Sequence, residues 1–278
     1  MKPIQMMMNG LPGKVAATIA AHALRQPGIE LLPYSLTGPE IEAGEQVLGD
    51  TTIALVKPDG RAGLIERLKR DHGGFISVDF THPSAVNANA QFYCDHELPF
   101  VMGTTGGDRE LLQRTVEAAA IPAVIAPNMA KQIVGLQAMM AFGGEQFATL
   151  FEGYRMTLEE SHQQGKADTS GTAKAMVGYF NQMGVRFNVD EIVQVRDPVV
   201  QQADWGIPEK HLEGHGWHTY TLTSPDGSVM FQFKHNVNGR DVYAPGTFEA
   251  VTFLAAQVAA GAKGRAFSMI DVLRRPNL

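Results

Sequence analysis

The first 130 residues alternate between short apolar segments typical of strands and longer segments with helical periodicity. Apolar runs at residues 3–8, 29–36, 53–56, 75–80, 100–102 and 123–126 predict strands, and the intervening patterns, at 15–24, 64–72, 83–97 and after 108, predict helices. Parallel strands need crossover connections, and helices supply them here, so the sheet is predicted to be parallel with helices on both faces. This alternation predicts an α/β domain with a doubly wound parallel sheet.

Beyond residue 130 the pattern changes, because strands now follow strands. Long helices are predicted at 130–151 and 172–183, and extended segments at 154–160, 192–196, 218–223 and 229–237. The sequence Thr-Ser-Pro-Asp-Gly at 223–227 is typical of a turn. An antiparallel or mixed sheet in an α+β domain is therefore expected at 131–240. The final apolar helix, at 247–260, is expected to pack on the first domain, which then comprises 1–130 plus 241–278.

The composition excludes several classes of protein. Of the 278 residues, 44% are hydrophobic and 19% charged, as in soluble globular chains, and the formal net charge of −6 makes nucleic acid an unexpected partner. The longest apolar runs fall short of the roughly 18 residues of a membrane span. A single cysteine, Cys94, fits a reducing compartment, and the first residues show no export or transit pattern, so a cytoplasmic location is expected.

The turn after the first predicted strand has the pattern of a dinucleotide-binding motif. It reads Gly-Leu-Pro-Gly-Lys-Val-Ala and places small residues at the positions where a backbone approaches a pyrophosphate and a helix packs on its strand. The alternative is an ordinary strand-to-helix turn, since proline replaces the middle glycine. The predicted cofactor residues of this turn are Gly10, Leu11, Pro12, Gly13, Lys14 and Val15.

The segment about 20 residues later bears on the choice between NADH and NADPH. Enzymes that use NAD place an acidic residue there to bind the ribose hydroxyls. This chain has the hydroxyl residues Ser35 and Thr37 instead, with Lys14 as a nearby cation, which favours NADPH. In the alternative interpretation Glu40 binds the ribose, so NADH is also possible.

Three further loops follow predicted strands at the sheet edge where open α/β sheets bind ligands. Each string alone is typical of a plain turn, and their shared edge is what favours a cofactor site. The residues predicted to contact the cofactor are Phe80, Gly103, Thr104, Thr105, Ala126, Pro127, Asn128 and Met129.

Residues 160–173 carry the richest set of reactive side chains. His162 can exchange protons and Lys166 can hold a carboxylate or donate a proton. Ser170, Gly171 and Thr172 open a helix whose N–H groups can bind a carboxylate. The pattern favours an anionic substrate, whereas the alternative is a capped helix after a solvated loop.

Two more features of the second domain have alternatives. Arg240 is either a surface arginine or a second carboxylate anchor. His211, His215 and His218 have the spacing of helical zinc ligands, but Gly214 and Gly216 disfavour that helix. No metal site is therefore expected.

Taken together, these motifs resemble the 4-hydroxy-tetrahydrodipicolinate reductase family over the whole chain. The resemblance rests on the glycine turn, Val78-Asp79-Phe80-Thr81, Gly103-Thr104-Thr105-Gly106, Ala126-Pro127-Asn128-Met129, the 160–173 block, Arg240 with Gly246-Thr247, and Met269-Ile270-Asp271-Val272-Leu273. The usual bacterial block reads E-x-H-H-x-x-K-x-D-x-P-S-G-T-A. Here Gln163 replaces the second histidine and the proline before Ser170 is missing, so the chain is similar to the plant-like branch.

The resemblance implies an N-terminal Rossmann domain that binds NADPH or NADH and a second domain for substrate binding and oligomerisation. It implies that His162 and Lys166 handle protons, that Gln163, Ser170, Gly171, Thr172 and Arg240 bind a dicarboxylate, and that the chain forms a homotetramer or a dimer. The expected reaction is reduction of 4-hydroxy-tetrahydrodipicolinate in lysine biosynthesis through diaminopimelate. Two alternatives remain open: another two-domain reductase of a small carboxylate, and a non-catalytic NADPH sensor.

Overall fold

The computed structural model describes residues 2–274, and the chain divides into two compact units. Unit 1 comprises Met1–Lys131 and Tyr243–Leu278, and unit 2 comprises Gln132–Val242. Among the described residues, no helix combines the length and the apolar character needed to cross a membrane.

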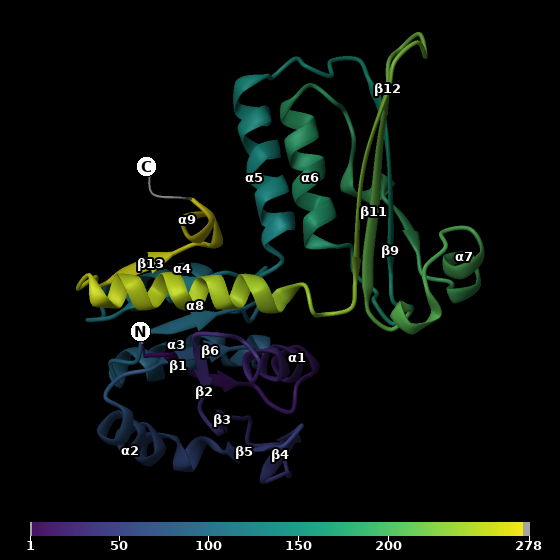
Figure 1. Ribbon diagram of the computed structural model, residues 1–278. Helices are drawn as coiled ribbons and strands as arrows, with labels where there is room; N and C mark the ends of the chain where they lie inside the picture. The colour runs from purple at the N-terminus through teal and green to yellow at the C-terminus, as the bar shows by residue number, and fades with distance from the viewer. Residues whose placement is uncertain (1, 275–278) are drawn as a thin grey trace. The chain divides into compact units, whose positions relative to one another are not determined.

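Unit 1 is built on a six-stranded parallel sheet of order β13-β8-β7-β6-β1-β2 (Figure 1). Its strands are β1 Ile4–Asn9, β2 Ile29–Leu31, β6 Ile76–Asp79, β7 Phe100–Met102, β8 Pro122–Ile125 and β13 Arg265–Phe267. The strand order reverses direction at β1, because the chain steps from β1 to β2 on one side and from β6 to β8 on the other. Crossovers that leave β1 in both directions place helices on both faces of the sheet, and the predicted doubly wound sheet is confirmed.

The helices of unit 1 connect these strands. They are α1 Lys14–Ala23, α2 Arg61–His72, α3 Val86–Asp95, α4 Arg109–Glu117, α8 Tyr243–Ala259 and α9 Met269–Leu273. A small sheet of order β3-β5-β4 lies beside them, with β3 Tyr34–Leu36, β4 Glu45–Leu48 and β5 Thr51–Val56.

Strand β1 shows why the sheet is buried on both faces. Met6, Met7 and Met8 are all fully buried, although successive side chains of a strand point to opposite faces. Met7 belongs to the core under α2, α3 and α4, together with Tyr93 and Phe100. Burial on both faces is the reason why these strands read as continuous apolar runs.

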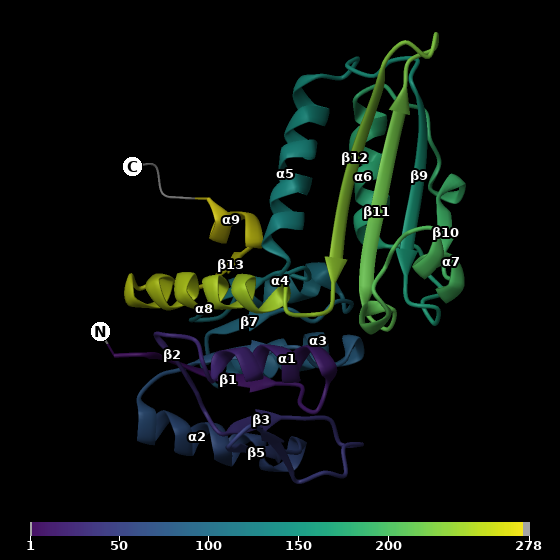
Figure 2. The ribbon, with the colours of Figure 1, turned by 45° about the vertical axis from the view of Figure 1, so that its right-hand side comes forward.

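Unit 2 is a four-stranded mixed sheet of order β10-β9-β11-β12 (Figure 2). Strand β10 runs parallel to β9, whereas β11 is antiparallel to both β9 and β12. Helices α5 and α6 pack on one face, where Leu158, Phe180 and Tyr220 form part of the core. The elements are α5 Lys131–Gln146, β9 Arg155–His162, α6 Gly171–Gln182, β10 Val193–Val195, α7 Pro198–Ala203, β11 His215–Thr223 and β12 Met230–Asn238.

The structure corrects several element boundaries. The strand predicted at 29–36 is two strands in different sheets, because Pro33 separates β2 from β3 and lacks the N–H that a ladder needs. The helix predicted at 130–151 ends at Gln146. Strands β4 and β13 and the short helix α7 were not predicted, since β4 and β13 are short and partly exposed and α7 has only six residues.

Candidate functional site

Two glycines shape the turn between β1 and α1. Gly10 has φ of 100°, and a Cβ atom there would lie 2.1 Å from the carbonyl oxygen of Phe80. A Cβ atom at Gly13 would lie 2.8 Å from the carbonyl oxygen of Gly10. No side chain of the described residues caps α1, so its first N–H groups and the positive end of its dipole can face a phosphate. Pro12, Gly13 and Lys14 are exposed at this helix end, whereas Val15 is half-buried.

The predicted cofactor residues Leu11, Ser35 and Thr37 are buried, and both hydroxyl side chains hydrogen-bond to the backbone of Leu11. The N–H of Leu11 donates to Ser35 Oγ at 3.2 Å, and Thr37 Oγ1 donates to the Leu11 carbonyl at 2.7 Å. Both hydroxyl groups therefore hold the glycine turn against β3. The charged groups at the carboxyl end of β3 include Arg61, which donates to the Thr37 carbonyl at 2.6 Å, and the exposed Glu40.

A fully buried carboxylate, Asp79, ends β6 and organises the neighbouring loops. Its Oδ1 accepts from the N–H and hydroxyl of Thr81, at 3.1 and 2.8 Å, and from Thr104 Oγ1 at 2.6 Å. Its Oδ2 accepts from Asn89 Nδ2 at 2.9 Å and from the Tyr93 hydroxyl at 2.7 Å. Burial, followed by the nearby Asp79 charge, raises the pKa of Tyr93, so this phenol stays protonated and donates. Asp79 lies within the Val-Asp-Phe-Thr motif, but nothing in the sequence alone indicates this supporting role.

The predicted loops after β6, β7 and β8 lie in sheet order at the carboxyl edge, beside the glycine turn after β1. The Phe80 ring packs against Gly103, where a Cβ atom would lie 2.2 Å from Phe80 Cζ. Thr105 and Pro127 are exposed, whereas Ala126 and Met129 are buried. Asn128, which is half-buried, accepts from the N–H of Ala130 through its side chain at 2.9 Å. The edge thus combines exposed loop residues with a buried polar support.

In unit 2, a buried carboxylate links three elements around the start of α6. Glu160 Oε1 pairs with the Arg196 guanidinium at 2.5 Å, and Oε2 accepts from the N–H of Ser170 at 3.0 Å. Burial raises the pKa of Glu160, but His218, Arg196 and the Ser170 N–H together lower it to about 2. No described side chain caps α6, so the N–H groups that follow Ser170, from Gly171 and Thr172, are available to an anion.

His162 ends β9 in a fixed orientation. Its ring lies over Gly216, where a Cβ atom would lie 2.9 Å from His162 Cε1, and its Nδ1 is 2.9 Å from the carbonyl oxygen of His215. A carbonyl only accepts, so Nδ1 carries the proton and Nε2 keeps its lone pair. Burial, followed by the nearby His218, lowers the pKa of His162 to about 4. The free protein therefore favours the neutral imidazole, and a proton-exchanging role for His162 stays a prediction.

The other predicted substrate residues surround the same region. Lys166 pairs with Asp168 at 2.5 Å, and the Lys166 charge is one of the influences that lower the pKa of His162. Gln163 is half-buried, and its backbone carbonyl accepts a hydrogen bond from the N–H of Lys166. A Cβ atom at Gly214 would lie 3.1 Å from Arg240 Nη1, so Arg240 lies beside the segment that supports the His162 ring.

The register of the sheet brings two further histidines to this site: His218, considered from the sequence only as part of a helical metal set, and His235, which the sequence did not indicate. Glu160 lies opposite His218, and His218 lies opposite His235 on β12. The rings of His218 and His235 stack with centroids 4.6 Å apart. Burial, followed by the nearby His218, lowers the pKa of His235 to about 4. His211, His215 and His218 do not form the helical set considered from their spacing, because His215 and His218 lie on a strand.

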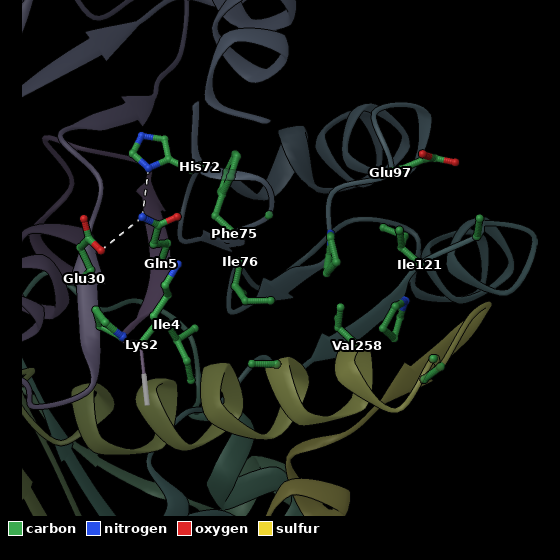
Figure 3. A pocket seen from close by; sticks show the side chains of 18 of the residues that line it. Lys2, Ile4, Gln5, Glu30, His72, Phe75, Ile76, Glu97, Ile121 and Val258 are labelled. Carbon is green, nitrogen blue, oxygen red and sulfur yellow. Dashed lines mark hydrogen bonds between the residues drawn. The ribbon is translucent and has the colours of Figure 1, made fainter. Parts of the chain in front are cut away.

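A cavity of about 860 Å³ lies at the opposite edge of the six-stranded sheet, near the amino ends of β1, β6 and β8 (Figure 3). Gln5 there donates to Glu30 at 3.2 Å and lies 3.0 Å from His72 Nδ1. None of the predicted site residues lines this cavity. Because open α/β sheets bind ligands at the carboxyl ends of their strands, we do not assign the cofactor to it.

Comparison with known proteins identifies relatives along the whole chain. The family model described as dihydrodipicolinate reductase, N-terminus, matches residues 4–129, and the one described as C-terminus matches residues 135–273. The chain is 45% identical over 272 residues to the probable 4-hydroxy-tetrahydrodipicolinate reductase 1, chloroplastic, of Oryza sativa subsp. japonica, covering 98% of this chain and 79% of the rice protein. It is also 45% identical over 276 residues to 4-hydroxy-tetrahydrodipicolinate reductase 1, chloroplastic, of Arabidopsis thaliana, covering 99% of this chain and 79% of that protein.

A solved structure agrees at the level of the fold. Dipicolinate-bound dihydrodipicolinate reductase from Paenisporosarcina sp. TG-14 aligns with a TM-score of 0.65 at 18% identity, covering 98% of this chain and 100% of that chain. The predicted fold class, a parallel Rossmann-like sheet with a second sheet domain, is confirmed.

The comparisons also correct one expectation. The rice and Arabidopsis relatives are named as chloroplastic enzymes, and this contradicts the predicted cytoplasmic location. Composition and a single cysteine could not distinguish two reducing compartments. The resemblance seen in the sequence is confirmed, since two family models together span nearly all of its length: the chain belongs to the dihydrodipicolinate reductase family.

Proposed function

We propose that this chain reduces 4-hydroxy-tetrahydrodipicolinate to tetrahydrodipicolinate with NAD(P)H, in lysine biosynthesis through diaminopimelate. When bound, the cofactor supplies a hydride to C4, and the 4-hydroxyl group leaves as water. The balanced reaction therefore consumes one NAD(P)H and one proton. The observation that carries the proposal is the grouping of His162, Lys166 and the uncapped amino end of α6 within one short segment.

Unit 2 supplies the groups that a dicarboxylate requires. The N–H groups of Gly171 and Thr172 would hold one carboxylate, with the Ser170 hydroxyl beside them, because the α6 dipole favours an anion at this end. Arg240 would hold the second carboxylate through its guanidinium. Gln163 would donate a hydrogen bond without adding charge.

Lys166 and His162 would have different roles toward the substrate. Lys166 has an ammonium group that can donate the proton that the departing hydroxyl needs, once it exchanges its Asp168 partner for substrate. His162 cannot donate from Nε2 in the tautomer fixed by His215. Its Nε2 lone pair instead accepts a hydrogen bond and orients the substrate.

Unit 1 would hold the cofactor as a dinucleotide-binding domain. Side chains at Gly10 and Gly13 would occupy space that the turn needs, and the amino end of α1 faces outward beside them, as a pyrophosphate site requires. The loops that begin at Phe80, Gly103 and Ala126 would contact the nicotinamide.

We propose NADPH as the preferred cofactor, with NADH also accepted. Arg61 provides a cation at the carboxyl end of β3 for a 2′-phosphate, supported by Lys14 at the start of α1. Glu40 disfavours the 2′-phosphate of NADPH, because its carboxylate lies near the same strand end. This carboxylate packs against Gly38, where a Cβ atom would lie 2.1 Å from Glu40 Oε1. Glu40→Gln should therefore raise the ratio of NADPH to NADH activity.

We also propose that the chain forms a homo-oligomer through unit 2. Apolar side chains on α5 and the edge strand β12 are exposed in the single chain, including Met139 (66%), Phe142 (60%) and Met230 (64%). Burying such side chains between copies would be favourable. Light scattering would distinguish a tetramer from a dimer.

The reaction is tested by generating the substrate in place. The preceding synthase would combine pyruvate with aspartate semialdehyde, and oxidation of NADPH or NADH would be followed by absorbance. Oxidation that depends on the synthase supports the proposal. Cofactor binding without oxidation would instead favour a sensor. Oxidation with aspartate semialdehyde alone would favour another reductase of a small carboxylate.

A further inference from the structure

Glu160, His162 and His218 bring three possible metal ligands together. Glu160 and His162 lie two residues apart on one face of β9, and His218 lies opposite Glu160 on β11. His162 Nε2 is 4.0 Å and His218 Nε2 is 3.6 Å from Glu160 Oε2, and the three ligand atoms all lie within 4.8 Å of one another.

The two imidazole nitrogens have no hydrogen-bond partner among residues 2–274. Both Nε2 atoms are buried, and His218 as a whole is only 3% exposed. Distances of 3.6 and 4.0 Å to Glu160 are too long for hydrogen bonds. Buried polar atoms without partners are costly, so the arrangement favours a ligand that all three groups can share.

The protonation of His162 suits a metal ligand. Its Nδ1–H donates to the His215 carbonyl, which fixes the ring and leaves the Nε2 lone pair directed at the cluster. Metal-binding histidines are commonly held by such a bond from their other nitrogen. Glu160 Oε2 still has a lone pair for a metal ion, because Arg196 pairs with Oε1 and Ser170 donates only one hydrogen bond to Oε2.

Two imidazoles and one carboxylate are typical ligands of Zn²⁺ and related ions. Ligands about 2.1 Å from a tetrahedral ion lie roughly 3.4 Å from one another, so small side-chain movements would close the site. The Arg196 charge opposes a second cation, so binding would be reversible.

We propose that Glu160, His162 and His218 bind one Zn²⁺-type ion, and that this ion inhibits the enzyme by occupying His162 Nε2. The inhibition rests on the proposed function, because it requires His162 to contact the substrate. The binding does not. The ion would compete with the substrate for the same nitrogen atom.

Binding is tested first with Co²⁺, whose visible spectrum reports four-coordinate nitrogen and oxygen ligands, on the full untagged chain after chelator treatment. One Co²⁺ per chain should bind, and Zn²⁺ should displace it. His218→Gln should weaken binding at least tenfold, whereas His72→Gln, which changes an exposed histidine of unit 1, should leave it unchanged. If His218→Gln does not fold, His162→Gln serves the same purpose, since that side chain lies at a strand end.

Inhibition is tested by titrating Zn²⁺ into the NADPH oxidation assay. Loss of activity should follow the Co²⁺ displacement curve, and chelator should restore it. Absence of saturable Co²⁺ binding, or binding unaffected by both histidine substitutions, would overturn the proposal. Because the spectrum needs no turnover, His218-dependent binding supports the site even if the reductase assay fails.

Discussion

Asp79→Asn removes the charge at the centre of the unit 1 network while keeping its size. Oδ1 can keep its three hydrogen bonds from Thr81 and Thr104, but the new amide meets the Asn89 amide and the Tyr93 hydroxyl, which are both donors. Two hydrogen bonds to a charged group are worth about 1.5–3 kcal/mol each. Rotation of the Tyr93 hydroxyl recovers part of this energy, so we expect the free energy of unfolding to fall by about 2–4 kcal/mol.

This loss is measurable by urea unfolding and by a fall in Tm of roughly 4–16 °C. The matched control is Asp95→Asn, which changes an exposed carboxylate that accepts from Gln91, and it should stay within about 0.5 kcal/mol of the parent. Asp79→Asn should also raise the KM for NADPH more than it lowers kcat, since Thr81 and Thr104 lie in the cofactor loops. Unchanged stability in Asp79→Asn would refute the assignment of Asp79 as the support of these loops.

Three more substitutions or measurements test other parts of the structure. Lys166→Ala should lower kcat by about 10²–10⁴, the usual contribution of a proton donor, and near-normal turnover would contradict that role. Gly103→Ala should displace the Phe80 ring and raise the KM for NADPH about tenfold, or 1.4 kcal/mol, whereas Gly63→Ala, in open space on α2, should stabilise the chain by up to about 1 kcal/mol. Burial, followed by the nearby negative charge of Asp95, raises the pKa of Cys94 to about 11, so its thiolate fraction at pH 8 is about 100-fold below that of an ordinary thiol. The rate of Cys94 alkylation should therefore rise tenfold per pH unit up to pH 10. A rate that levels off near pH 9 would contradict the raised pKa.

The architecture could be predicted because its signals are local. Each strand of the parallel sheet is a short apolar run between helical patterns, and the turn at 223–227 has residues suited to its backbone. The division of 29–36 into two strands was harder, because Pro33 is one residue within an otherwise apolar run. Strand β13 pairs only with β8, a partner about 140 residues away. Nothing near Arg265 in the sequence indicates that pairing.

The site was predictable only where its residues adjoin in sequence. His162, Lys166 and Ser170 fall within one segment and could be grouped without knowing the fold. Glu160 adjoins them too, but its role depends on Arg196 and His218, which are 36 and 58 positions away (196 − 160 and 218 − 160) and reach it through strand pairing. Likewise, the importance of Asp79 arises from partners on other elements.

Strand register explains why the cluster of Glu160, His162 and His218 lies at this end of the unit 2 sheet. On the covered face of β9 the side chains run Met156, Leu158, Glu160 and His162, and the pairing partners of Leu158 and Glu160 on β11 are Tyr220 and His218. Strands β9 and β11 therefore change from apolar to ionisable side chains at paired positions. Strand β12 makes the same change, with Phe233 opposite Tyr220 and His235 opposite His218. A slip of one residue would turn these side chains to the other face and separate the cluster from the core that fixes it. The apolar residues that stabilise unit 2 thus also hold Glu160 and His162 in register, so substitutions in that core should disturb the site before they unfold the unit.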